Sequence, residues 1–396
     1  MKEKYDYLII GGGIVGLSIG WELLRKYPNS NVLVVDKENS TGQHASGRNS
    51  GVLHAGFYYS PETLKAKFCL QGNRELRELI ASESIGINNC GKVVVAKDDE
   101  DLIRLENLYK RGISNGVELE LLEAQNLERI EPLAKTFKRF LWSPSTAVSD
   151  PIRVTNSIEK RFLALGGRIL TNSNAQITSD GELLINDKRV QSEYIINAAG
   201  SSAIHLAHKV GVGREYSQLP VLGLYKVTSN SNLPLTRLVY PVPNPKNPFL
   251  GVHFTLTVDG SVKIGPTAIP ILGREQYSLK DLPNMQDILS GLSSLFALFK
   301  VSPRDLFHLA YTELPKISLK ILTDSGSLLV PKANSDIKWS SKKPGIRAQL
   351  VNLETGKFEM DYVVRKNHNQ IHILNAVSPG WTSSLPFSRW IISQLL

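Results

Sequence analysis

The first strand of this chain runs into a glycine pattern that restricts the fold more than any other feature. Tyr5–Ile10 is a short apolar run, YDYLII, of the kind that forms a buried parallel strand. Gly11, Gly13 and Gly16 then fill the three glycine positions of G-x-G-x-x-G. In a dinucleotide-binding turn these glycines make the tight turn, admit a pyrophosphate to the backbone and let the next helix pack closely on the strand. Taken alone, such a pattern is a weak signal.

The residues after the glycines make the signal specific. A helical segment, LSIGWELLRKY, is stopped by Pro28, and Asn31–Val35 predicts a second strand. That strand ends at Asp36, which lies 20 residues after Gly16 and is placed to accept hydrogen bonds from a ribose, with Lys37 beside it. Strand, glycines, helix, strand and acid together predict a Rossmann-like unit that holds a dinucleotide. The alternative is a chance glycine turn.

A second stretch, Gly42–Lys67, is dense in small residues, hydroxyls and amides. Its glycines let the backbone approach a ligand, and its short polar side chains can bond to phosphate or main chain. An ordinary polar loop is the alternative, but it does not explain why the apolar VLHAGFYY, which contains His54, follows without a break. We therefore interpret the stretch as the floor of an active site. The cofactor contacts expected here are Ser46, Gly47, Arg48, Asn49, Ser50 and Gly51.

Composition excludes several classes of protein. The 396 residues are 42% hydrophobic and 21% charged, so we expect two or three globular domains. The net charge of +9 is spread along the chain without the basic and aromatic runs of a nucleic-acid groove, so no nucleic-acid partner is expected. Cys69 and Cys90 are too few for a disulfide framework or a cysteine zinc site, and no other metal-ligand spacing appears. No apolar run is long enough to span a membrane, and a reducing, cytoplasmic location fits.

Further helices and strands are predicted along the rest of the chain. Helices are predicted at Gln71–Ile80, Asp98–Gly116 and Pro151–Gly167, and strands at Gly91–Ala96 and near Tyr194. Asp259 and Gly260 join two further strands in a hairpin, and a final helix runs to Leu396.

Several motifs together resemble one family. They are Gly11–Gly16, Asp36, His44–Cys69, Tyr240–Thr255, Asp259–Ile269, Pro344–Leu350 and Ile373–Ser384. Their text is similar to that of the FAD-dependent L-2-hydroxyglutarate dehydrogenases and oxidases, a branch of the D-amino-acid-oxidase-like flavoproteins. The resemblance covers nearly the whole chain and is weakest in Ser278–Trp339; GRNSGVLHAG, FLGVHFT and GIRAQ look specific to the branch.

The resemblance implies an α/β fold in two parts. A Rossmann-like FAD-binding domain of the D-amino-acid-oxidase type would be discontinuous, made of residues 1–85, 146–215 and 340–396. An inserted substrate domain, α+β with a mixed sheet, would be made of residues 86–145 and 216–339.

The resemblance also implies the cofactor and its contacts. FAD would lie extended, with its ribose at Asp36, its pyrophosphate at the glycine loop and its isoalloxazine at Arg48–Gly51. The last helix would begin under the flavin, where its dipole and free N–H groups stabilise the anionic reduced ring; an ordinary Ser/Thr helix cap is the alternative. His44 lies where some relatives attach FAD covalently, but the closer branch binds FAD non-covalently, and this mode is expected. Gly200, Ser378, Gly380, Thr382 and Ser383 complete the expected cofactor contacts.

On the substrate side, Arg347 matches the position that holds the α-carboxylate in this superfamily, and its planar fork suits that task. A surface ion pair is the commoner fate of an arginine. His54 is the expected base for the hydroxyl proton, with His253 as its competitor, although either could be a core histidine. Tyr59 and Lys65 are weaker candidates for holding a distal carboxylate.

The expected function is therefore oxidation of L-2-hydroxyglutarate, a dicarboxylic hydroxy acid, to 2-oxoglutarate, with electrons passed to quinone or oxygen. An alternative is an oxidase or dehydrogenase of another small acid, such as an amino acid or glycerol 3-phosphate. Another is a non-catalytic flavin-binding assembly or RNA-modification factor, against which the presence of His54, His253 and Arg347 argues.

One apolar stripe bears on the identity of the electron acceptor. Leu292, Leu295, Phe296 and Phe299 lie at helical spacing in Leu282–Val301, next to Lys300 and Arg304. Such a stripe is more often core, yet an apolar face flanked by cations is also what an interfacial anchor needs. Both interpretations stay open. The second adds a membrane quinone and an anionic membrane surface as partners, on the inner face of the cytoplasmic membrane.

Overall fold

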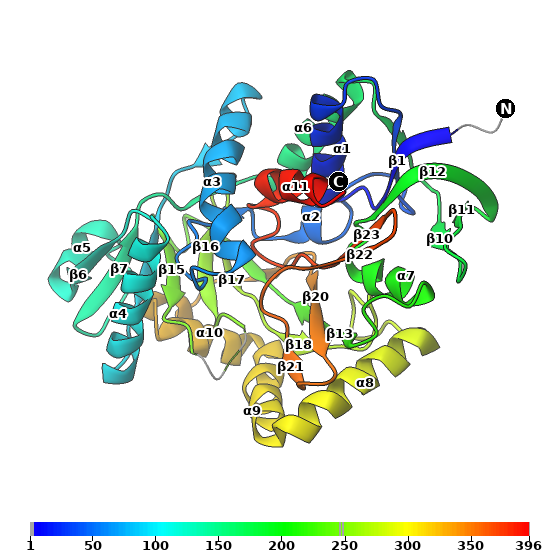
Figure 1. The fold of residues 1–396 in the computed structure, drawn as a ribbon. Helices are drawn as coiled ribbons and strands as arrows, with labels where there is room; N and C mark the ends of the chain where they lie inside the picture. Colours follow the sequence, from blue (N-terminus) through cyan, green and yellow to red (C-terminus); the bar gives the residue numbers. More distant parts are fainter. Residues whose placement is uncertain (1–3, 245–246, 248, 396) are drawn as a thin grey trace.

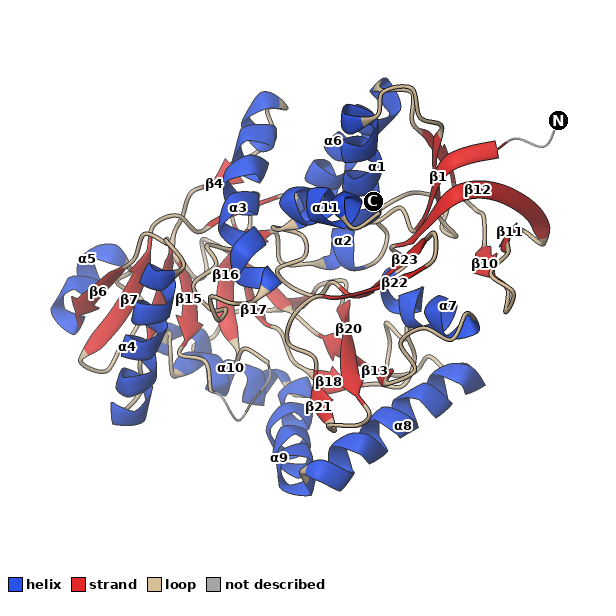
Figure 2. Ribbon diagram, in the orientation of Figure 1, coloured by secondary structure: helices blue, strands red, loops and turns tan. Residues whose placement is uncertain are grey.

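The computed structural model describes residues 4–244, 247 and 249–395 and contains two large sheets (Figures 1 and 2). The first sheet is built around β1, which pairs in parallel with β2 on one side and β12 on the other. Its strands are β1 (Lys4–Ile10), β2 (Val32–Val35), β9 (Arg168–Leu170), β10 (Ala175–Ile177), β11 (Leu183–Ile185), β12 (Lys188–Asn197), β22 (Val363–Asn367) and β23 (Gln370–Asn375). The Rossmann-like unit predicted from the first 36 residues is confirmed.

Three helices from distant parts of the chain pack together beside this sheet (Figure 1). They are α1 (Ile14–Lys26), α6 (Pro151–Ala164) and α11 (Ser384–Ser393). Their apolar faces join the strands in one buried cluster that includes Ile9, Leu17 and Phe387. Residues near both ends of the chain therefore build the same core.

The second large sheet is mixed, and every neighbouring pair of its strands is antiparallel except β5 and β15. Its order is β19 (Ser340–Ser341), β14 (Lys226–Ser229), β17 (Ser261–Gly265), β16 (His253–Leu256), β15 (Leu238–Pro241), β5 (Lys92–Val95), β7 (Arg139–Ser143) and β6 (Glu120–Glu123). The turn at Asp259 and Gly260 joins β16 to β17, as predicted. The predicted α/β class, with a mixed-sheet insertion into a Rossmann-like fold, is confirmed.

Two small sheets complete the strand structure. One has the order β18 (Ile269–Pro270), β13 (Tyr216–Gly223), β20 (Gly345–Asn352) and β21 (Lys357–Phe358); the other has the order β3 (Val52–Leu53), β8 (Ala147–Ser149) and β4 (Ile87–Asn88). β20 pairs with β13 along its full length. The ladder thus joins residues on opposite sides of the domain boundary expected at 340, and the boundaries themselves stay a prediction.

The remaining helices surround these sheets (Figure 2). They are α2 (Ala45–Arg48), α3 (Leu64–Ser82), α4 (Asp99–Ser114), α5 (Leu127–Ile130), α7 (Ala203–Lys209), α8 (Met285–Val301), α9 (Pro303–Glu313) and α10 (Leu319–Ser327), with 3-10 turns η1 (Ala124–Asn126), η2 (Gly200–Ser202), η3 (Leu314–Ile317) and η4 (Pro331–Asn334). α3 begins seven residues before the predicted Gln71, because the Thr63 hydroxyl caps it by accepting from Ala66 N. Leu396 and three residues of the Tyr240–Thr255 motif, Pro245, Lys246 and Pro248, lie outside the described residues.

The structure corrects the core interpretation of the apolar stripe on α8. Phe296 is 71% exposed and Leu292 and Phe299 about half exposed, whereas Leu295 is partly buried against a small core cluster. The core interpretation is therefore wrong for three of the four residues. Helical spacing predicted the face correctly, but not whether another element covers it. In the part of the chain that the structure describes, no helix combines the length and apolar character needed to cross a bilayer.

Close backbone approach fixes how α3 meets the C-terminal segment. A Cβ at Gly72 would lie 2.2 Å from the carbonyl oxygen of Thr382, a distance that backbone atoms cannot accommodate without a shift. The Thr382 hydroxyl in turn bonds to the strand and loop that carry His54.

We therefore expect Gly72→Ala to lower the free energy of unfolding by about 1–3 kcal/mol, the usual cost of overpacking, and to weaken retention of the cofactor. Thermal melts and the ratio of flavin to protein absorbance would measure both effects. Gln71→Ala, on the exposed face of the same helix, is the matched control and should change neither. An unchanged melting temperature for Gly72→Ala would contradict this packing.

Candidate active site

The glycine turn after β1 leaves room for a ligand but not for side chains. A Cβ at Gly11, whose φ is +112°, would lie 2.4 Å from the Ala198 carbonyl oxygen, and one at Gly16 would lie 2.0 Å from the Gly11 carbonyl oxygen. Gly13 is the N-cap residue of α1 and has no side chain to cap it, and the first turn of the helix contains no acidic residue. Such an N-terminus is suited to bind phosphate. The turn therefore fits the pyrophosphate of a dinucleotide.

Asp36 braces the same turn. Its Oδ2 accepts from Gly12 N at 2.7 Å and its Oδ1 from Glu38 N at 2.9 Å. A carboxylate has further lone pairs, so it retains acceptor capacity for a ribose hydroxyl, the role expected of it. Lys37 forms ion pairs with Glu38 and Glu275.

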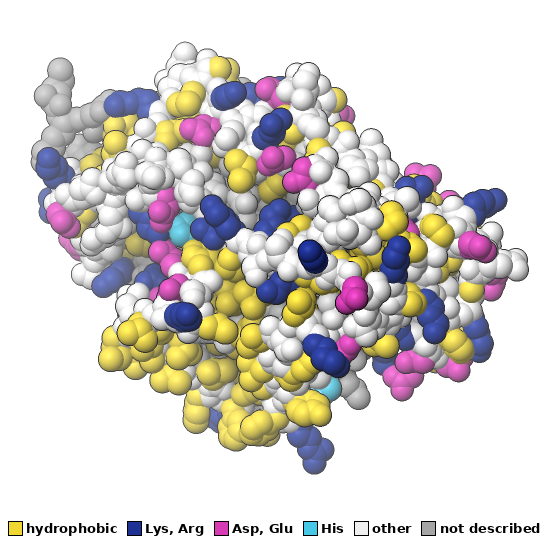
Figure 3. All heavy atoms as spheres, turned by 180° about the vertical axis from the view of Figure 1, so that it is seen from behind, with side chains coloured by type: hydrophobic (Ala, Val, Ile, Leu, Met, Phe, Trp, Pro, Cys, Tyr) yellow, Lys and Arg dark blue, Asp and Glu magenta, His cyan; other side chains and the backbone are white. Residues whose placement is uncertain are grey.

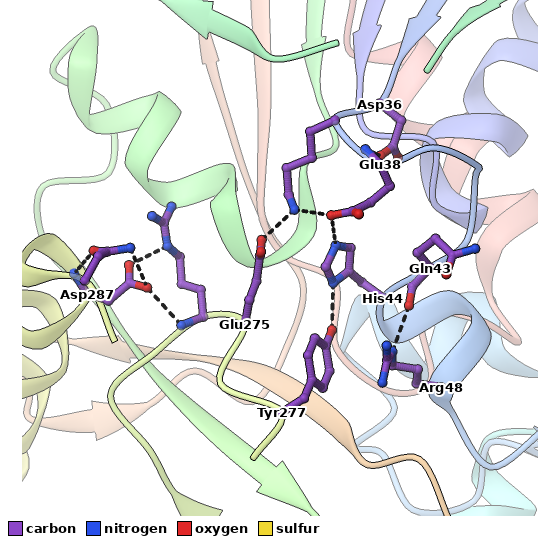
Figure 4. Close-up of polar contacts among 11 residues, drawn as sticks. Asp36, Glu38, Gln43, His44, Arg48, Glu275, Tyr277 and Asp287 are labelled. Carbon is purple, nitrogen blue, oxygen red and sulfur yellow. Dashed lines mark hydrogen bonds and ion pairs between the residues drawn. The ribbon is translucent and has the colours of Figure 1, made fainter. Parts of the chain in front are cut away.

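His44 lies in a polar network beside this turn (Figure 4). Its Nε2 is 2.9 Å from Glu38 Oε1 and its Nδ1 is 2.6 Å from the Tyr277 hydroxyl. Both ring nitrogens are thus engaged, which leaves neither free to bond covalently to a flavin in this arrangement. Glu38, His44 and Glu275 place three donor atoms within 4.8 Å of one another. The Lys37 ammonium pairs with both carboxylates there, so the cluster is an ion-pair network rather than a metal site.

The loop that was expected to meet the flavin is held by its own polar side chains. Ser46 Oγ accepts from Ile14 N at 2.9 Å, which links α2 to the first turn of α1. Asn49 bridges the loop by donating to the Ser46 carbonyl oxygen and accepting from Gly51 N, both at 2.8 Å. Ser50 uses its carbonyl oxygen to accept from Lys263 Nζ at 3.2 Å.

Two glycines of this loop are also packed closely against neighbouring backbone. A Cβ at Gly47 would meet the Gly42 carbonyl oxygen at 2.4 Å, and one at Gly51 the Ser149 carbonyl oxygen at 2.3 Å. Arg48 stacks its guanidinium 3.9 Å from the Tyr277 ring centre. Through Tyr277, the loop Ile271–Pro283 thereby contacts the loop that is expected to bind the cofactor.

The other expected cofactor residues lie in two places. Gly200 opens η2, next to the end of β12. Ser378, Gly380, Thr382 and Ser383 lead into α11, and Thr382 Oγ1 donates to the Val52 carbonyl oxygen at 3.1 Å and accepts from His54 N at 3.2 Å. The structure brings the start of α11 next to His54, as the expected arrangement requires.

A cavity of about 600 Å³ joins most of the expected substrate residues. Its polar lining includes His54, Tyr59, Lys65, Arg347 and Ser378. Its apolar lining includes Phe249 together with Leu298 and Val301 of α8 and Leu306 and Leu309 of α9. The Arg347 guanidinium lies 5.6 Å from the Phe249 ring centre, where the two kinds of lining meet.

Arg347 projects from β20 and is half-buried in this cavity. Burial lowers its pKa from the ordinary value, while the nearby phenols of Tyr59 and Tyr225 act in the opposite direction. Among the described residues its guanidinium has no carboxylate partner. A desolvated cation without a partner is costly unless an anion joins it, which fits a carboxylate clamp.

His54 follows β3 and turns its ring to the cavity, with Nε2 3.5 Å from Ser378 Oγ. Burial, and then the charges of Lys92, His253 and Arg347, hold its pKa well below the ordinary value. The ring is therefore neutral near pH 7 and can accept a proton. An ordinary histidine titrates near pH 6–7, and the sequence did not show the burial or the cations around this ring.

His253, the competing base, lies on β16 and is not among the residues that line this cavity. Its ring stacks on Tyr240 with 3.9 Å between ring centres, and its Nδ1 is 2.8 Å from the Gly251 carbonyl oxygen. Burial lowers its pKa to about 3. These contacts are typical of a core histidine.

Lys65, in the first turn of α3, is 4% exposed and lines the cavity near Arg347. Burial lowers its pKa to about 7, and the Arg347 charge acts in the same direction. Its ammonium lies 5.9 Å from the Tyr59 ring centre. Burial raises the pKa of Tyr59, so that phenol remains a hydrogen-bond donor.

Two buried lysines were missed in the sequence. Lys92 on β5 is fully buried, and Lys263 on β17 is 5% exposed and contacts the expected flavin loop. The available signal was a single lysine inside an apolar strand, in GKVVVA and SVKIG. A charge is rarely buried in a strand unless it is used.

Comparisons with known proteins agree with this geometry. The model of a family described as FAD dependent oxidoreductase matches residues 6–393. The L-2-hydroxyglutarate dehydrogenase of Escherichia coli (strain K12) is 33% identical over 400 residues, 99% of this chain and 93% of that protein. A mitochondrial L-2-hydroxyglutarate dehydrogenase of Bos taurus is 32% identical over 422 residues, 99% of this chain and 89% of that protein.

Solved structures share the fold. An L-alpha-glycerophosphate oxidase from Mycoplasma pneumoniae with FAD bound superposes with a TM-score of 0.76 at 24% identity, covering 99% of this chain and 95% of that one. A glycine oxidase from Geobacillus kaustophilus gives 0.72 at 17% identity, covering 99% and 94%. With the glycine turn, the start of α1 and Asp36 all suited to FAD, the chain belongs to the D-amino-acid-oxidase (DAO) family of FAD-dependent oxidoreductases, in the branch that contains the L-2-hydroxyglutarate dehydrogenases.

Proposed function

We propose that this enzyme oxidises L-2-hydroxyglutarate to 2-oxoglutarate. The observation that carries the proposal is the presence of two cations, Arg347 and Lys65, on the cavity that His54 lines. One carboxylate would need one of them, and a substrate with two carboxylates would use both. The names of the relatives support the same substrate.

Each residue has a separate task in this proposal. The Arg347 fork holds the α-carboxylate and so fixes the C2–H bond, and Lys65, with the Tyr59 hydroxyl, holds the distal carboxylate. His54, neutral near pH 7, takes the hydroxyl proton on Nε2 while C2 loses its hydride and the C–O bond becomes a carbonyl. FAD, when bound, accepts that hydride. Ser378 Oγ lies 3.5 Å from His54 Nε2, at the place where the substrate hydroxyl would meet it.

The alternatives use these residues less fully. A monocarboxylic amino acid would bring no second carboxylate to Lys65, whose charged form is favoured within the chain by Asp361. Glycerol 3-phosphate would pair with the cations but offers no α-carboxylate to the Arg347 fork. A non-catalytic flavin protein would need neither cation.

The apolar lining of the cavity supports a proposal for the electron acceptor. We propose that the reduced enzyme passes its electrons to a quinone drawn from an anionic membrane surface. On α8, Leu298 and Val301 line the cavity while Phe296 faces outward, so one helix borders both the cavity and the solvent. The space-filling view shows apolar side chains gathered over this part of the molecule (Figure 3).

The exposed apolar residues extend across α8 and α9 and into η3. They are Leu282, Met285, Leu289, Leu292, Phe296, Phe299, Phe307, Tyr311, Leu314 and Ile317. Lys300 and Arg304 are exposed beside them. An apolar face with cations at its border suits the headgroup boundary of an anionic bilayer. A quinone dissolved in the bilayer would reach the apolar lining of the cavity from this boundary.

For the substrate, we expect L-2-hydroxyglutarate to bleach the flavin absorbance of the anaerobic enzyme faster than D-2-hydroxyglutarate, amino acids or glycerol 3-phosphate. Arg347→Lys keeps the charge but loses the fork, so it should lose about 2–4 kcal/mol of transition-state stabilisation, measured as a lower kcat/KM.

Lys65→Met separates the dicarboxylate from the alternatives: it should raise KM for L-2-hydroxyglutarate and spare L-2-hydroxybutyrate, which lacks the distal carboxylate. Bleaching by an amino acid or glycerol 3-phosphate but not by L-2-hydroxyglutarate would refute the proposed substrate.

For the cofactor, we expect FAD to be bound non-covalently, because both nitrogens of His44 are engaged. Acid precipitation should release the yellow colour into the supernatant, and a coloured pellet would contradict this. Asp36→Ala should weaken FAD retention in gel filtration and leave the order of substrate preference unchanged.

For the acceptor, we expect the enzyme to sediment with vesicles of phosphatidylglycerol and phosphatidylcholine at low salt and to leave them as salt rises. Turnover should be faster with a soluble quinone analogue than with oxygen.

Phe296→Asp combined with Phe299→Asp should abolish sedimentation and preserve the melting temperature, since both rings are exposed. Ile103→Asp, at an exposed apolar position on α4, is the matched control. Enzyme that stays in the supernatant at low salt would refute the membrane surface as a partner.

A further inference from the structure

Lys92 is a buried cation that the chemistry described above does not use. Its side chain is fully buried on β5, and its Nζ has no hydrogen-bond partner among the described residues. Three aromatic rings surround the ammonium, with ring centres at 4.2 Å for Tyr240, 5.0 Å for Tyr58 and 5.4 Å for Phe57. Such a cage attracts a cation through the ring faces but does not replace its water.

The cage lies next to both histidines. Tyr240 stacks on His253, and the strand register of β5, β15 and β16 places Lys92, Tyr240 and His253 on the same face of the sheet. Tyr58 is four residues after His54 in the chain. The Tyr58 hydroxyl and His54 Nδ1 are, like Lys92 Nζ, buried without a hydrogen-bond partner in the described structure. Three polar groups are thus left to act on one another through space.

The charges around this cluster can be named from every side. Cys69 of α3 and Cys90 before β5 lie near Lys92, but burial raises the pKa of Cys69 to about 12 and that of Cys90 to about 11, so both stay neutral thiols near pH 7. Arg347 of β20 adds its charge to that of Lys92 at both histidines. Tyr58 and Tyr240 stay protonated, because burial raises their pKa values. Lys92 is therefore the group in this cluster whose charge changes near neutral pH, since burial lowers its pKa to about 7.

We propose that Lys92 is a positioning residue for the proton-accepting step: its ammonium, caged beside the two histidines, adds to the effect of burial in keeping His54 and His253 uncharged at acidic pH. The first proton that enters the cluster settles on Lys92. A second proton, on either histidine, then meets a like charge in a medium of low dielectric constant. His54 therefore keeps its free electron pair under conditions in which an ordinary histidine would be charged. The kinetic part of this inference rests on the proposed function; the electrostatic part does not.

The kinetic test follows the rate constant of flavin reduction against pH in the native holoenzyme and three variants. Lys92→Met removes the charge, so the acidic pH at which the rate falls to half should move upward by about one unit, the usual size of such an interaction. Lys92→Arg stays charged and should keep the low midpoint of the native enzyme. Lys97→Met, just after the same strand and partly exposed, should not move it.

A second test needs no substrate. The ring nitrogens of the histidines can be titrated by NMR in the oxidised holoenzyme, with His54→Asn and His253→Gln assigning the two signals. In Lys92→Met both should take up protons at higher pH than in the native enzyme. Unchanged titration would overturn the inference whatever the substrate is. A shifted titration with no bleaching by L-2-hydroxyglutarate would instead refute only the proposed function.

The stability of the variant adds a check on folding. Folding lowers the Lys92 pKa, so the native fold is destabilised as pH falls from the ordinary lysine pKa through about 7. Lys92→Met should therefore melt at a higher temperature than the native enzyme at pH 6, and the difference should shrink towards pH 10. If it loses FAD, Lys92→Gln removes the same charge and takes its place in both tests.

Discussion

The Thr382 hydroxyl holds together parts of the chain that are far apart in sequence. The hydroxyl donates to the Val52 carbonyl oxygen and accepts from the amide of His54. The backbone carbonyl oxygen of Thr382 occupies the space that a side chain on Gly72 would need. A loop near the N-terminus, helix α3 and the start of the last helix therefore meet at one point. The placement of His54 depends on this junction, and so does the distance between His54 and Ser378.

Unusually many cations are buried around that junction. Lys65, Lys92 and Lys263 are each no more than 5% exposed, and Arg347 lines the cavity beside them. Burial on this scale costs stability, because the cations lose water and gain few carboxylate partners. The cost is offset when anions bind, which suits the proposed dicarboxylic acid and a flavin that becomes anionic on reduction. Burial and the same cations keep the ring of His54 unprotonated.

The sequence was informative where a signal was local. The glycines and the Asp259–Gly260 turn act through their own backbone, and Asp36 acts on the glycine turn beside it through its carboxylate. It was less informative where the answer depended on another segment. Nothing near His54 or His253 says which ring faces the cavity, because the pairing of β16 and the position of α11 decide that. The exposure of Phe296 depends likewise on whether another element covers α8.

Arg347 lies within a ladder of eight residue pairs, from Tyr216 opposite Asn352 to Gly223 opposite Gly345. A slip of one residue in that ladder would turn the guanidinium to the opposite face of the sheet, so the clamp is either present or lost. Protein engineers who want a different acid gain little from altering this strand. The helical turn of Lys65 and the apolar walls of α8 and α9 can be rebuilt one side chain at a time, and substrate range is more readily altered there.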